Sequence, residues 1–323
     1  QALPLQRRIS RPSSSSKALP LAKEPCRGSL CLLFASSQRK SSRLLATPRR
    51  SACWTTSPDH KSPNTGTKWR SCFGSGPVNL QIPTTCEAFD DVCKKRAWGG
   101  DGVSGSFSGS GSSVAVTSIL CKTLTQAILD AAQEKQEQSR AEGGVVLRVL
   151  DAPNGDFFWM PHCLAAIEIR LPDNATLEYH GVDVSKESTA LSEKRRGEAS
   201  SRLQKTTINS FRTLDVAAPG ILEQTFPDVH FDVIMCHDAI QHNPHSNVRS
   251  ILSNFDLAGD RLVLDVDKAG SSAADIAAGD FRPLDITASP YGYEPECMDK
   301  NTAQDDSEQE HFAIFKLPLI ASA

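Results

Sequence analysis

Short apolar runs alternate with longer, more polar segments between residues 145 and 266, and this alternation constrains the fold more than any other feature. Each run has the length of a strand, and most of the intervening segments have the apolar spacing of helices. Strands joined through helices run parallel, because the chain has to cross back over the sheet before each new strand. The predicted strands are 145–150, 177–184, 208–214, 231–236 and 261–266. We therefore expect an α/β fold with a mostly parallel, doubly wound sheet.

The predicted helices cover 113–133, 157–169 and 185–205, and a fourth follows the 231–236 strand and ends near residue 255. A Gly/Ser-rich stretch over 98–113 leads directly into the first of them. Beyond the last parallel strand, 281–286 and 311–317 also have the pattern of strands, but no good helix separates them. Strands without a crossover helix pair antiparallel, so we expect these two at an edge of the sheet.

The first 85 residues differ in composition from the rest of the chain. They contain 14 Lys and Arg against two Asp and Glu, together with 15 Ser, whereas the remainder carries 21 basic and 36 acidic residues. A segment with so little apolar periodicity does not bury enough surface to offset the entropy of ordering it. We expect residues 1–85 to be a disordered basic leader, either an organellar transit peptide or an artefact of translation.

Composition also bounds the partners and the compartment. The acidic remainder offers no basic face for phosphates, so we expect no nucleic-acid partner. No apolar run approaches the ~18 residues that span a bilayer, and we expect no membrane partner. The ten Cys include no CxxC pair, which argues against a disulfide framework or a structural zinc site. These features favour an intracellular protein, cytoplasmic or, if the leader is a genuine transit peptide, organellar.

Acidic residues follow the predicted strands at their carboxyl ends, where doubly wound sheets bind ligands. They are Asp151 and Asp156 around the first turn, then Asp183, Asp215 and Asp238. An acid at the end of the second strand accepts hydrogen bonds from both hydroxyls of a ribose in many nucleotide-binding α/β proteins. Asp183 is the candidate for that role.

The first turn discriminates between nucleotide ligands. A dinucleotide pyrophosphate calls for several glycines at a helix N-terminus, whereas only Gly155 occupies this turn and Asp156 follows it. A carboxylate there repels a pyrophosphate and suits a ligand with a sulfonium and an amino group.

The chain resembles class I S-adenosylmethionine-dependent methyltransferases over about residues 98–318. Within that class it is similar to a group whose first motif reads D-x-P-C-G-D-F-x-W-M, which is matched here by Asp151, Pro153, Gly155, Asp156, Phe157, Trp159 and Met160. The similarity continues in the order Trp98, Ser106, Ser108, Gly109, Gly111 and Ser112 upstream, then 179–185 (YHGVDVS), Cys236, Asp238 and His242, and 281–286 (FRPLDI). The departures are Asn154 in place of Cys, His237 where the group often has Arg, and Asn243-Pro244 in place of an apolar residue.

The resemblance implies a Rossmann-like sandwich with an antiparallel edge strand and S-adenosyl-L-methionine as the cofactor. It does not identify the acceptor, but aromatic and amide-rich walls from Tyr291-Gly292-Tyr293 and the Gly/Ser loop would suit a small polar or sugar-like molecule. Residues 86–144 would cover the cofactor site and residues 145–323 would form the methyltransferase domain. Within the pocket, Asp183 would hold the ribose, and Asp215 with Val216 would face the adenine. The full implied cofactor set is Asp151, Pro153, Asn154, Gly155, Asp156, Phe157, Trp159, Asp183, Val184, Asp215, Val216 and Cys236. The implied lid over substrate or cofactor is Trp98, Ser108, Gly109, Gly111 and Ser112.

Asp238 and His242 are the candidate catalytic pair. They are four residues apart, so on a helix they would share a face and one could orient the other. A base is needed if the acceptor is a hydroxyl or an ammonium that loses a proton. We therefore expect His242 as the general base and Asp238 as its partner, while a helix-capping Asp238 beside an ordinary polar His242 is the competing interpretation.

Three other function classes are compatible with parts of the sequence. A metal-dependent hydrolase is suggested by four residues close together in sequence, His237, Asp238, His242 and His245. Their spacing fits no metal motif, and Pro244 interrupts the helix that would present them, so we expect no metal. A nicotinamide oxidoreductase lacks its glycine pair. A catalytically inactive cofactor-binding protein is left open by Asn154 and His237.

Overall fold

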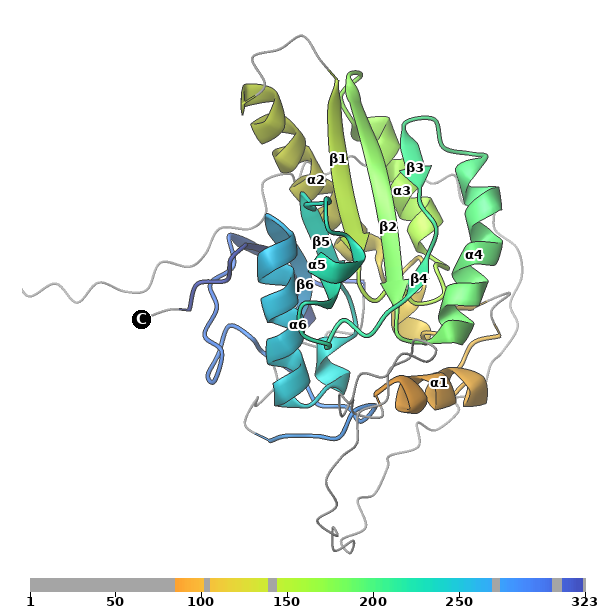
Figure 1. Cartoon of the computed structure of the whole chain (residues 1–323), viewed down its shortest axis with the longest axis vertical. Coiled ribbons are helices and arrows are strands. Elements are labelled where there is room, and N and C mark those ends of the chain that lie inside the picture. The colour runs from red at the N-terminus through yellow and green to blue at the C-terminus, as the bar shows by residue number, and fades with distance from the viewer. Residues whose placement is uncertain (1–84, 102–104, 139–143, 269–273, 304–309, 322–323) are drawn as a thin grey trace, which may run out of the picture.

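The computed structural model describes residues 85–101, 105–138, 144–268, 274–303 and 310–321. The expected leader therefore lies outside the described residues, except for Thr85, with which helix α1 begins. In the described residues, eight strands form one mixed sheet in the order β3-β2-β1-β5-β6-β8-β7, and β4 pairs with the carboxyl end of β2 (Figure 1). The strands are β1 (Val145–Asp151), β2 (Ala175–Asp183), β3 (Thr206–Ile208), β4 (Arg212–Thr213), β5 (Val233–Cys236), β6 (Arg261–Asp267), β7 (Cys297–Lys300) and β8 (Glu310–Lys316).

Strands β1 to β6 are parallel to their neighbours, and β8 pairs antiparallel with both β6 and β7. From β1 the chain first winds outward through β2 and β3 and then returns to β5 on the other side of β1. This reversal creates a crevice beside the carboxyl end of β1. The expectation of a mostly parallel, doubly wound α/β sheet with an antiparallel edge is confirmed.

Helices cover both faces of the sheet (Figure 1). One face packs against α2, α3 and α4, and the other against α5 and α6. Helix α1 lies across the end of the sheet, where it contacts α4. The helices are α1 (Thr85–Lys95), α2 (Ser118–Gln138), α3 (Met160–Arg170), α4 (Lys186–Ser200), α5 (Ile221–Thr225) and α6 (His245–Ala258), with short 3-10 turns at Ser110–Ser112 and Ile240–His242.

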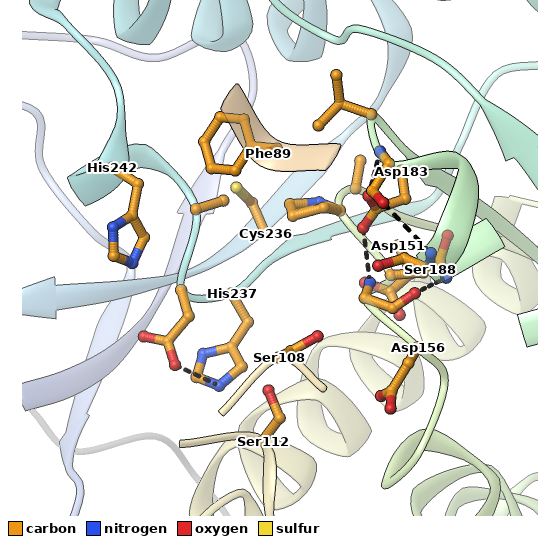
Figure 2. A pocket seen from close by; sticks show the side chains of 18 of the residues that line it. Phe89, Ser108, Ser112, Asp151, Asp156, Asp183, Ser188, Cys236, His237 and His242 are labelled. Carbon is orange, nitrogen blue, oxygen red and sulfur yellow. Dashed lines mark hydrogen bonds and ion pairs between the residues drawn. The ribbon is translucent and has the colours of Figure 1, made fainter. Parts of the chain in front are cut away.

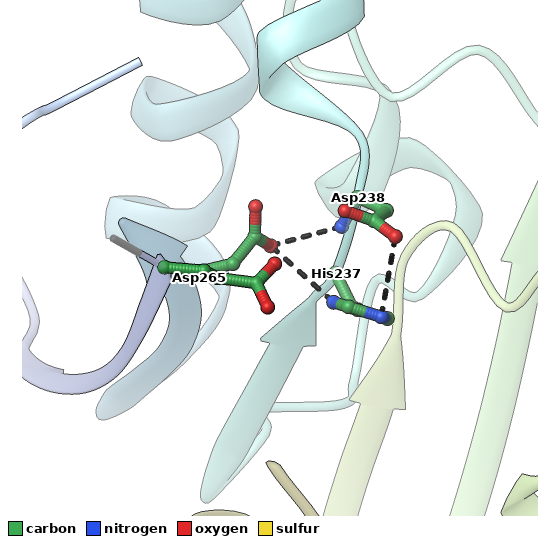
Figure 3. Close-up of side chains that lie close together, drawn as sticks. His237, Asp238 and Asp265 are labelled. Carbon is green, nitrogen blue, oxygen red and sulfur yellow. Dashed lines mark hydrogen bonds and ion pairs between the residues drawn. The ribbon is translucent and has the colours of Figure 1, made fainter. Parts of the chain in front are cut away.

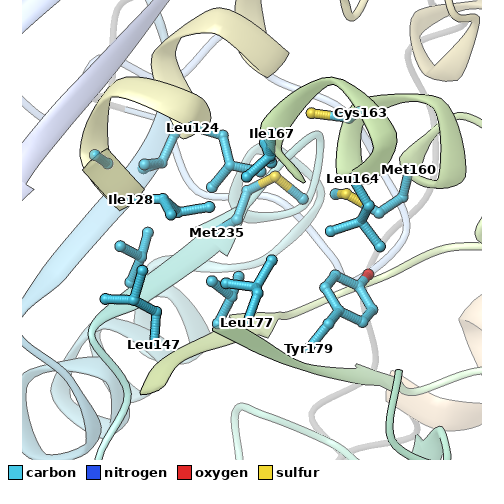
Figure 4. Close-up of a cluster of buried hydrophobic side chains, with 14 of the residues drawn as sticks. Leu124, Ile128, Leu147, Met160, Cys163, Leu164, Ile167, Leu177, Tyr179 and Met235 are labelled. Carbon is cyan, nitrogen blue, oxygen red and sulfur yellow. The ribbon is translucent and has the colours of Figure 1, made fainter. Parts of the chain in front are cut away.

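The alternation of side chains along β1 explains the two cores. Leu147 and Val149 point to the α2 and α3 face, whereas Leu150 belongs to the cluster under α5 and α6. Figure 4 shows the first cluster, in which Leu124 and Ile128 of α2 meet the strand side chains. A buried Leu to Ala change in such a cluster costs about 2–5 kcal/mol, so these contacts fix the sheet under the crevice.

Two strand predictions differ from the structure. The 281–286 segment is not a strand, because Pro283 lacks a backbone donor and the neighbouring amide of Arg282 donates to Gln241 O instead of to a strand. The edge strand is β7 instead. The predicted 208–214 strand is broken into β3 and β4, because the Phe211 ring turns inward over Gly181, where a Cβ would overlap it.

The cysteine prediction also needs correction. Cys121 of α2 and Cys163 of α3 form a disulfide with Cα atoms 5.6 Å apart. Spacing in sequence gave no signal for this pair, because the two cysteines meet only when the helices pack side by side on β1. No helix in the described part of the chain is long and apolar enough to cross a membrane.

Candidate functional site

A cavity of about 330 Å³ opens at the carboxyl ends of β1, β2, β4 and β5. That volume is in the range of small-molecule sites. Figure 2 shows Asp151, Asp156 and Asp183 on one side of the cavity and His237 and His242 on the other. Of the residues expected at the site, those that line the cavity are Trp98, Ser108, Gly109, Gly111, Ser112, Asp151, Pro153, Asn154, Gly155, Asp156, Trp159, Asp183, Val184, Asp215, Val216, Cys236, Asp238 and His242.

Phe157 is the expected cofactor residue that does not line the cavity. Its ring is buried in the core, 5.4 Å from the ring of Tyr179 and 4.9 Å from that of Phe211. Phe157 of the motif therefore packs in the core and supports the turn after β1. A motif match alone does not distinguish a residue that contacts a ligand from one that holds the loop that does.

Asp183 at the end of β2 fixes the first turn. Its Oδ2 accepts from the Gly155 amide at 3.0 Å and its Oδ1 from the Ser185 amide at 2.7 Å. Burial raises the pKa of Asp183 to about 7 although these two amides lower it. Each carboxylate oxygen has two lone pairs, so both retain capacity for a donor on a ligand.

Asp151 at the end of β1 is a second enclosed carboxylate. Tyr179 donates a hydrogen bond to its Oδ2, while its Oδ1 has no partner. Burial raises the pKa of Asp151 to about 8, partly opposed by the Tyr179 hydroxyl. A buried acceptor without a donor is costly, so Oδ1 is suited to a donor or a cation in the cavity.

Unsatisfied acceptors recur around the cavity. Asn154 donates through Nδ2 to Ser192 at 2.8 Å, but its Oδ1 has no partner. Asp215 accepts from the Ala217 amide at 2.9 Å through Oδ1, while Oδ2 has none. The Gln241 Oε1 is likewise buried without a donor. Together with Asp151, these residues line one cavity and carry four buried acceptor atoms without a donor. Such a lining is compatible with a ligand rich in N–H and O–H donors.

Asp156 lines the cavity and also holds the Gly/Ser loop in place. Its Oδ1 accepts from Ser106 at 2.8 Å, and its Oδ2 accepts from the Phe107 amide at 2.9 Å and pairs with Arg195 at 3.0 Å. These contacts tie the Gly/Ser loop to the first turn and supply a positive partner. Asp156 thus anchors the loop over the cavity, and its charge is already balanced.

Two glycines allow this loop to lie close to the strand ends. A Cβ on Gly111 would come 2.5 Å from Asp238 Oδ2, and a Cβ on Gly155 would come 2.5 Å from Ser108 Oγ. Gly155 also has φ of +56°, which is unfavourable for residues with a side chain. The Gly/Ser composition therefore reflects close backbone approach here rather than a linker.

The expected pairing of Asp238 with His242 is not what the structure shows. Asp238 has φ of +50° and its Oδ1 accepts from Gln241 Nε2 at 2.7 Å. The Nδ1 of His242 lies 2.9 Å from Asp280 O. The helix that would have put the two on one face is replaced by the 3-10 turn Ile240–His242. A backbone carbonyl, not Asp238, orients His242.

The contact with Asp280 O also fixes the proton position on His242. A carbonyl oxygen only accepts, so Nδ1 carries the hydrogen, and the neutral ring has its lone pair on Nε2. The ring packs 5.0 Å from Trp98 and 5.5 Å from Phe281 between ring centroids. Trp98 in turn packs 6.0 Å from Phe89 of α1. These rings form an aromatic wall on one side of the cavity.

His237 sits in a cluster with three carboxylates, Asp238, Asp265 and Glu310 (Figure 3). Burial lowers the pKa of His237, but Asp238 and Asp265 outweigh this and raise it to about 10. His242 and His245 do not join this cluster, because their Nδ1 atoms contact Asp280 O and Tyr291 Oη. Of the four residues grouped by sequence as a possible metal site, His237 and Asp238 therefore lie in the cluster, and His242 and His245 do not.

Several residues at the cavity had no sequence signal. Phe89 and Cys93 come from α1, Ser188 from α4 and Gln241 from the turn after β5. Cys93 Sγ lies 3.5 Å from Ser188 Oγ, and the Lys186 amide donates to Asp90 at 3.0 Å, so α1 is held to the start of α4. Helix α1 lies at the boundary of the Ser-rich segment, and its apolar face is too short to stand out.

No protein-family model matches the chain, and no curated protein matches it. Among solved structures, it is similar to a magnesium protoporphyrin IX methyltransferase from Synechocystis PCC 6803 with bound SAM, at 13% identity and a TM-score of 0.38, over 74% of this chain and 97% of that one. The DszA carbon methyltransferase gives 12% identity and a TM-score of 0.42, over 64% of this chain and 55% of that one.

A putative class I S-adenosylmethionine-dependent methyltransferase from Listeria monocytogenes gives 11% identity and a TM-score of 0.37, over 62% of this chain and 60% of that one. At such identities and TM-scores the likeness carries no inference about activity. The architecture rests on the strand order given above, and the function has to be argued from the cavity itself.

Proposed function

We propose that the chain is an S-adenosylmethionine-dependent methyltransferase. The observation that carries the proposal is the set of buried acceptor atoms without donors on Asp151, Asn154, Asp215 and Gln241, all around one cavity at the strand ends. S-adenosylmethionine presents an ammonium, two ribose hydroxyls and an adenine amino group, all of which are donors. The residues present therefore fit this cofactor.

Each acceptor residue is proposed to contact a different part of the cofactor, according to the strand that it follows. We assign the ribose hydroxyls to Asp183 and the adenine amino group to Asp215, because both residues line the cavity, at the end of β2 and after β4. We assign the ammonium of the methionine part to Asp151 and Asn154, which line the cavity beside the first turn and each have one oxygen without a donor. A dinucleotide is disfavoured, because Asp151 and Asp183 flank the turn where its pyrophosphate would lie.

The cofactor, when bound, supplies a methyl group on a positively charged sulfur. The contribution of the protein to an in-line displacement is to align the acceptor and exclude water. The loop anchored by Asp156 closes one side of the cavity, and the aromatic wall with Trp98 and Phe89 closes another. His242 faces the cavity with its Nε2 lone pair available, so it is the candidate base for an acceptor hydroxyl.

The acceptor is proposed to be a small polar molecule or a sugar-like one that carries several hydroxyls. Its support is the mixture of an aromatic wall with hydroxyl and amide groups, Ser108, Ser112 and Gln241, along the same cavity. Rings that stack on aromatic side chains and hydroxyls that bind amides are compatible with such a surface.

Calorimetric titration of the full chain with S-adenosylhomocysteine tests the proposal. We expect one site per chain, and Asp183→Asn to weaken binding by about 10-fold to 100-fold, since hydrogen bonds to a charged group contribute about 1.5–3 kcal/mol. Asp256→Asn is the matched control, because Asp256 also accepts a backbone amide, from Leu319 at 2.8 Å, but does not line the cavity.

Two other outcomes separate the competing classes. Saturable heat with NAD and none with S-adenosylhomocysteine would contradict the proposal and favour an oxidoreductase. Binding of S-adenosylmethionine without any methylated product across a panel of polyhydroxylated acceptors would leave a cofactor-binding protein and remove the enzymatic part of the proposal.

A further inference from the structure

Four side chains of types that ligate metals converge beside the cavity, and two of them, His237 and Asp238, also line it (Figure 3). His237 and Asp238 follow β5, Asp265 lies in the neighbouring β6, and Glu310 begins β8. One ligand atom from each lies within 4.8 Å of the others. Three adjacent strands of the sheet thus supply one imidazole and three carboxylates to a single point.

His237 is the observation that sets this cluster apart from an ordinary group of acids. Its side chain is only 5% exposed, yet neither ring nitrogen has a hydrogen-bond partner. Nε2 lies 3.5 Å from Asp238 Oδ2 and Nδ1 lies 3.6 Å from Asp265 Oδ1, both beyond good hydrogen-bond length. A buried imidazole among three carboxylates, without a good hydrogen bond to any of them, is positioned to give up its ring proton to a cation that takes its place.

Packing prevents the ring from turning to another partner. The Trp159 ring lies 6.2 Å from His237 on one side and the Phe312 ring 5.9 Å on another, both close to edge-on. The side chain is therefore held in the orientation that faces the carboxylates. A ligand that is fixed in advance loses little entropy when an ion binds.

The three carboxylates are oriented by neutral donors. The Asp238 amide donates to Asp265 Oδ1 at 2.9 Å, and Gln241 Nε2 donates to Asp238 Oδ1 at 2.7 Å. Asn301 Nδ2 donates to Glu310 Oε2 at 2.6 Å. Hydrogen bonds of this kind hold ligating carboxylates in place without removing their negative charge.

We propose that His237, Asp238, Asp265 and Glu310 bind one divalent first-row transition-metal ion of the Mn²⁺ or Fe²⁺ type. Carboxylates suit Mn²⁺, and an imidazole favours a transition metal over Mg²⁺ or Ca²⁺. His237 and Asp238 line the cavity, so the ion has an open side toward it. This proposal replaces the expectation of no metal. It keeps His237 and Asp238 from the sequence-based group and exchanges His242 and His245 for Asp265 and Glu310.

The metal site stands independently of methyl transfer. Only its use rests on the proposed function: an acceptor oxygen would take the open position, where the ion lowers the pKa of a hydroxyl and holds it near the cofactor. A failed S-adenosylhomocysteine titration would leave the metal measurement unaffected, and a failed metal measurement would leave cofactor binding unaffected.

Titration of the full chain with Mn²⁺, followed by the decrease of the free-ion electron paramagnetic resonance signal, tests the site. We expect one tightly bound Mn²⁺ per chain, and at least a 10-fold loss of affinity in both His237→Gln and Asp265→Asn. The control is His230→Gln, which removes an imidazole that also lies beside a carboxylate, 2.8 Å from Asp260, on the exposed surface. Its affinity should equal that of the wild type.

A measurement on the wild-type chain keeps the test independent of how the variants fold. Pulsed electron paramagnetic resonance of the Mn²⁺ complex should show ¹⁴N coupling from one directly bound imidazole, which is absent in a site of carboxylates alone. Absence of saturable binding, absence of ¹⁴N coupling, or an equal loss of affinity in His230→Gln would each overturn the proposal.

Discussion

The carboxyl group of Asp151 is enclosed at the end of β1, with one oxygen held by Tyr179 and the other without a partner. Its pKa of about 8 in the folded chain exceeds that of an Asp in an unfolded chain, about 4. The folded state consequently binds more protons than the unfolded state between these two values. Stability of the unliganded protein should decrease as pH rises through this window.

Asp151→Asn tests this argument at a single residue. The amide retains an acceptor for Tyr179 but does not titrate, so the decrease in unfolding free energy from pH 5 to pH 8 should become smaller. Urea denaturation of wild type and variant at several pH values measures it. Parallel curves for the two proteins would show that Asp151 is not the source of the pH dependence.

Gly111 offers a second test at the residue scale. A methyl group there would meet Asp238 Oδ2 at 2.5 Å, so either this carboxylate, which Gln241 holds through Oδ1, or the Gly/Ser loop has to shift. Gly111→Ala should weaken S-adenosylhomocysteine binding by about tenfold or more, which calorimetry measures, with little loss of fold stability because the loop is at the surface of the cavity.

Gly197→Ala is the matched control for that change. Gly197 lies inside α4 with nothing within 4 Å of its Cβ position, so Ala should stabilise the helix by about 0.5–1 kcal/mol and leave binding unchanged. Equal effects of the two substitutions on affinity would contradict the close approach of the loop.

Sequence patterns at the residue scale located the cavity but did not predict the contacts that hold its residues in place. Asp183 and Asp215 follow strands whose apolar runs are clear, so their position at the carboxyl edge was predictable. The anchoring role of Asp156 depends on Arg195, which comes from a helix whose rotation the sequence does not specify. Tertiary contacts of this kind are outside what spacing along the chain encodes.

Among the elements, α2 and α3 also have contacts that spacing along the chain does not predict. Their helical spacing was readable, with bounds that differ by a few residues, but the bridge between Cys121 and Cys163 depends on how the two helices pack. The 281–286 segment shows the converse, because its alternating pattern suggested a strand and its backbone amides bond to loops instead. Pro283 argued against a strand at this position, because proline has no backbone donor for a strand partner.

The disulfide gives a prediction at the element scale. The double substitution Cys121→Ser and Cys163→Ser should lower the free energy of unfolding by about 2–4 kcal/mol, since the bridge closes a loop of 42 residues between two helices of the main core. Denaturant unfolding under non-reducing conditions measures the difference.

The control for this prediction is Cys93→Ser, which removes a free thiol on α1. It should change the free energy of unfolding much less than the double substitution. Identical unfolding curves for the wild type and the double variant would show that the bridge does not form or does not constrain the unfolded chain.

At the scale of the whole molecule, the cavity joins parts of the chain that are distant in sequence. The first turn after β1, the end of β2, the turn after β5 and helix α1 each supply a part of its wall. The parallel order of the sheet brings these ends to one edge, and the loop anchored on Asp156 covers them. The proposed cofactor site is therefore a property of the strand order and of no single motif.

The central claim is that the unpaired acceptors around this cavity serve S-adenosylmethionine. A crystal structure of the chain with S-adenosylhomocysteine tests it most directly. We expect ribose hydroxyls within hydrogen-bond distance of Asp183 and the adenine amino group beside Asp215 Oδ2. A ligand bound elsewhere, or bound in the cavity with these carboxylates still unpaired, would contradict it.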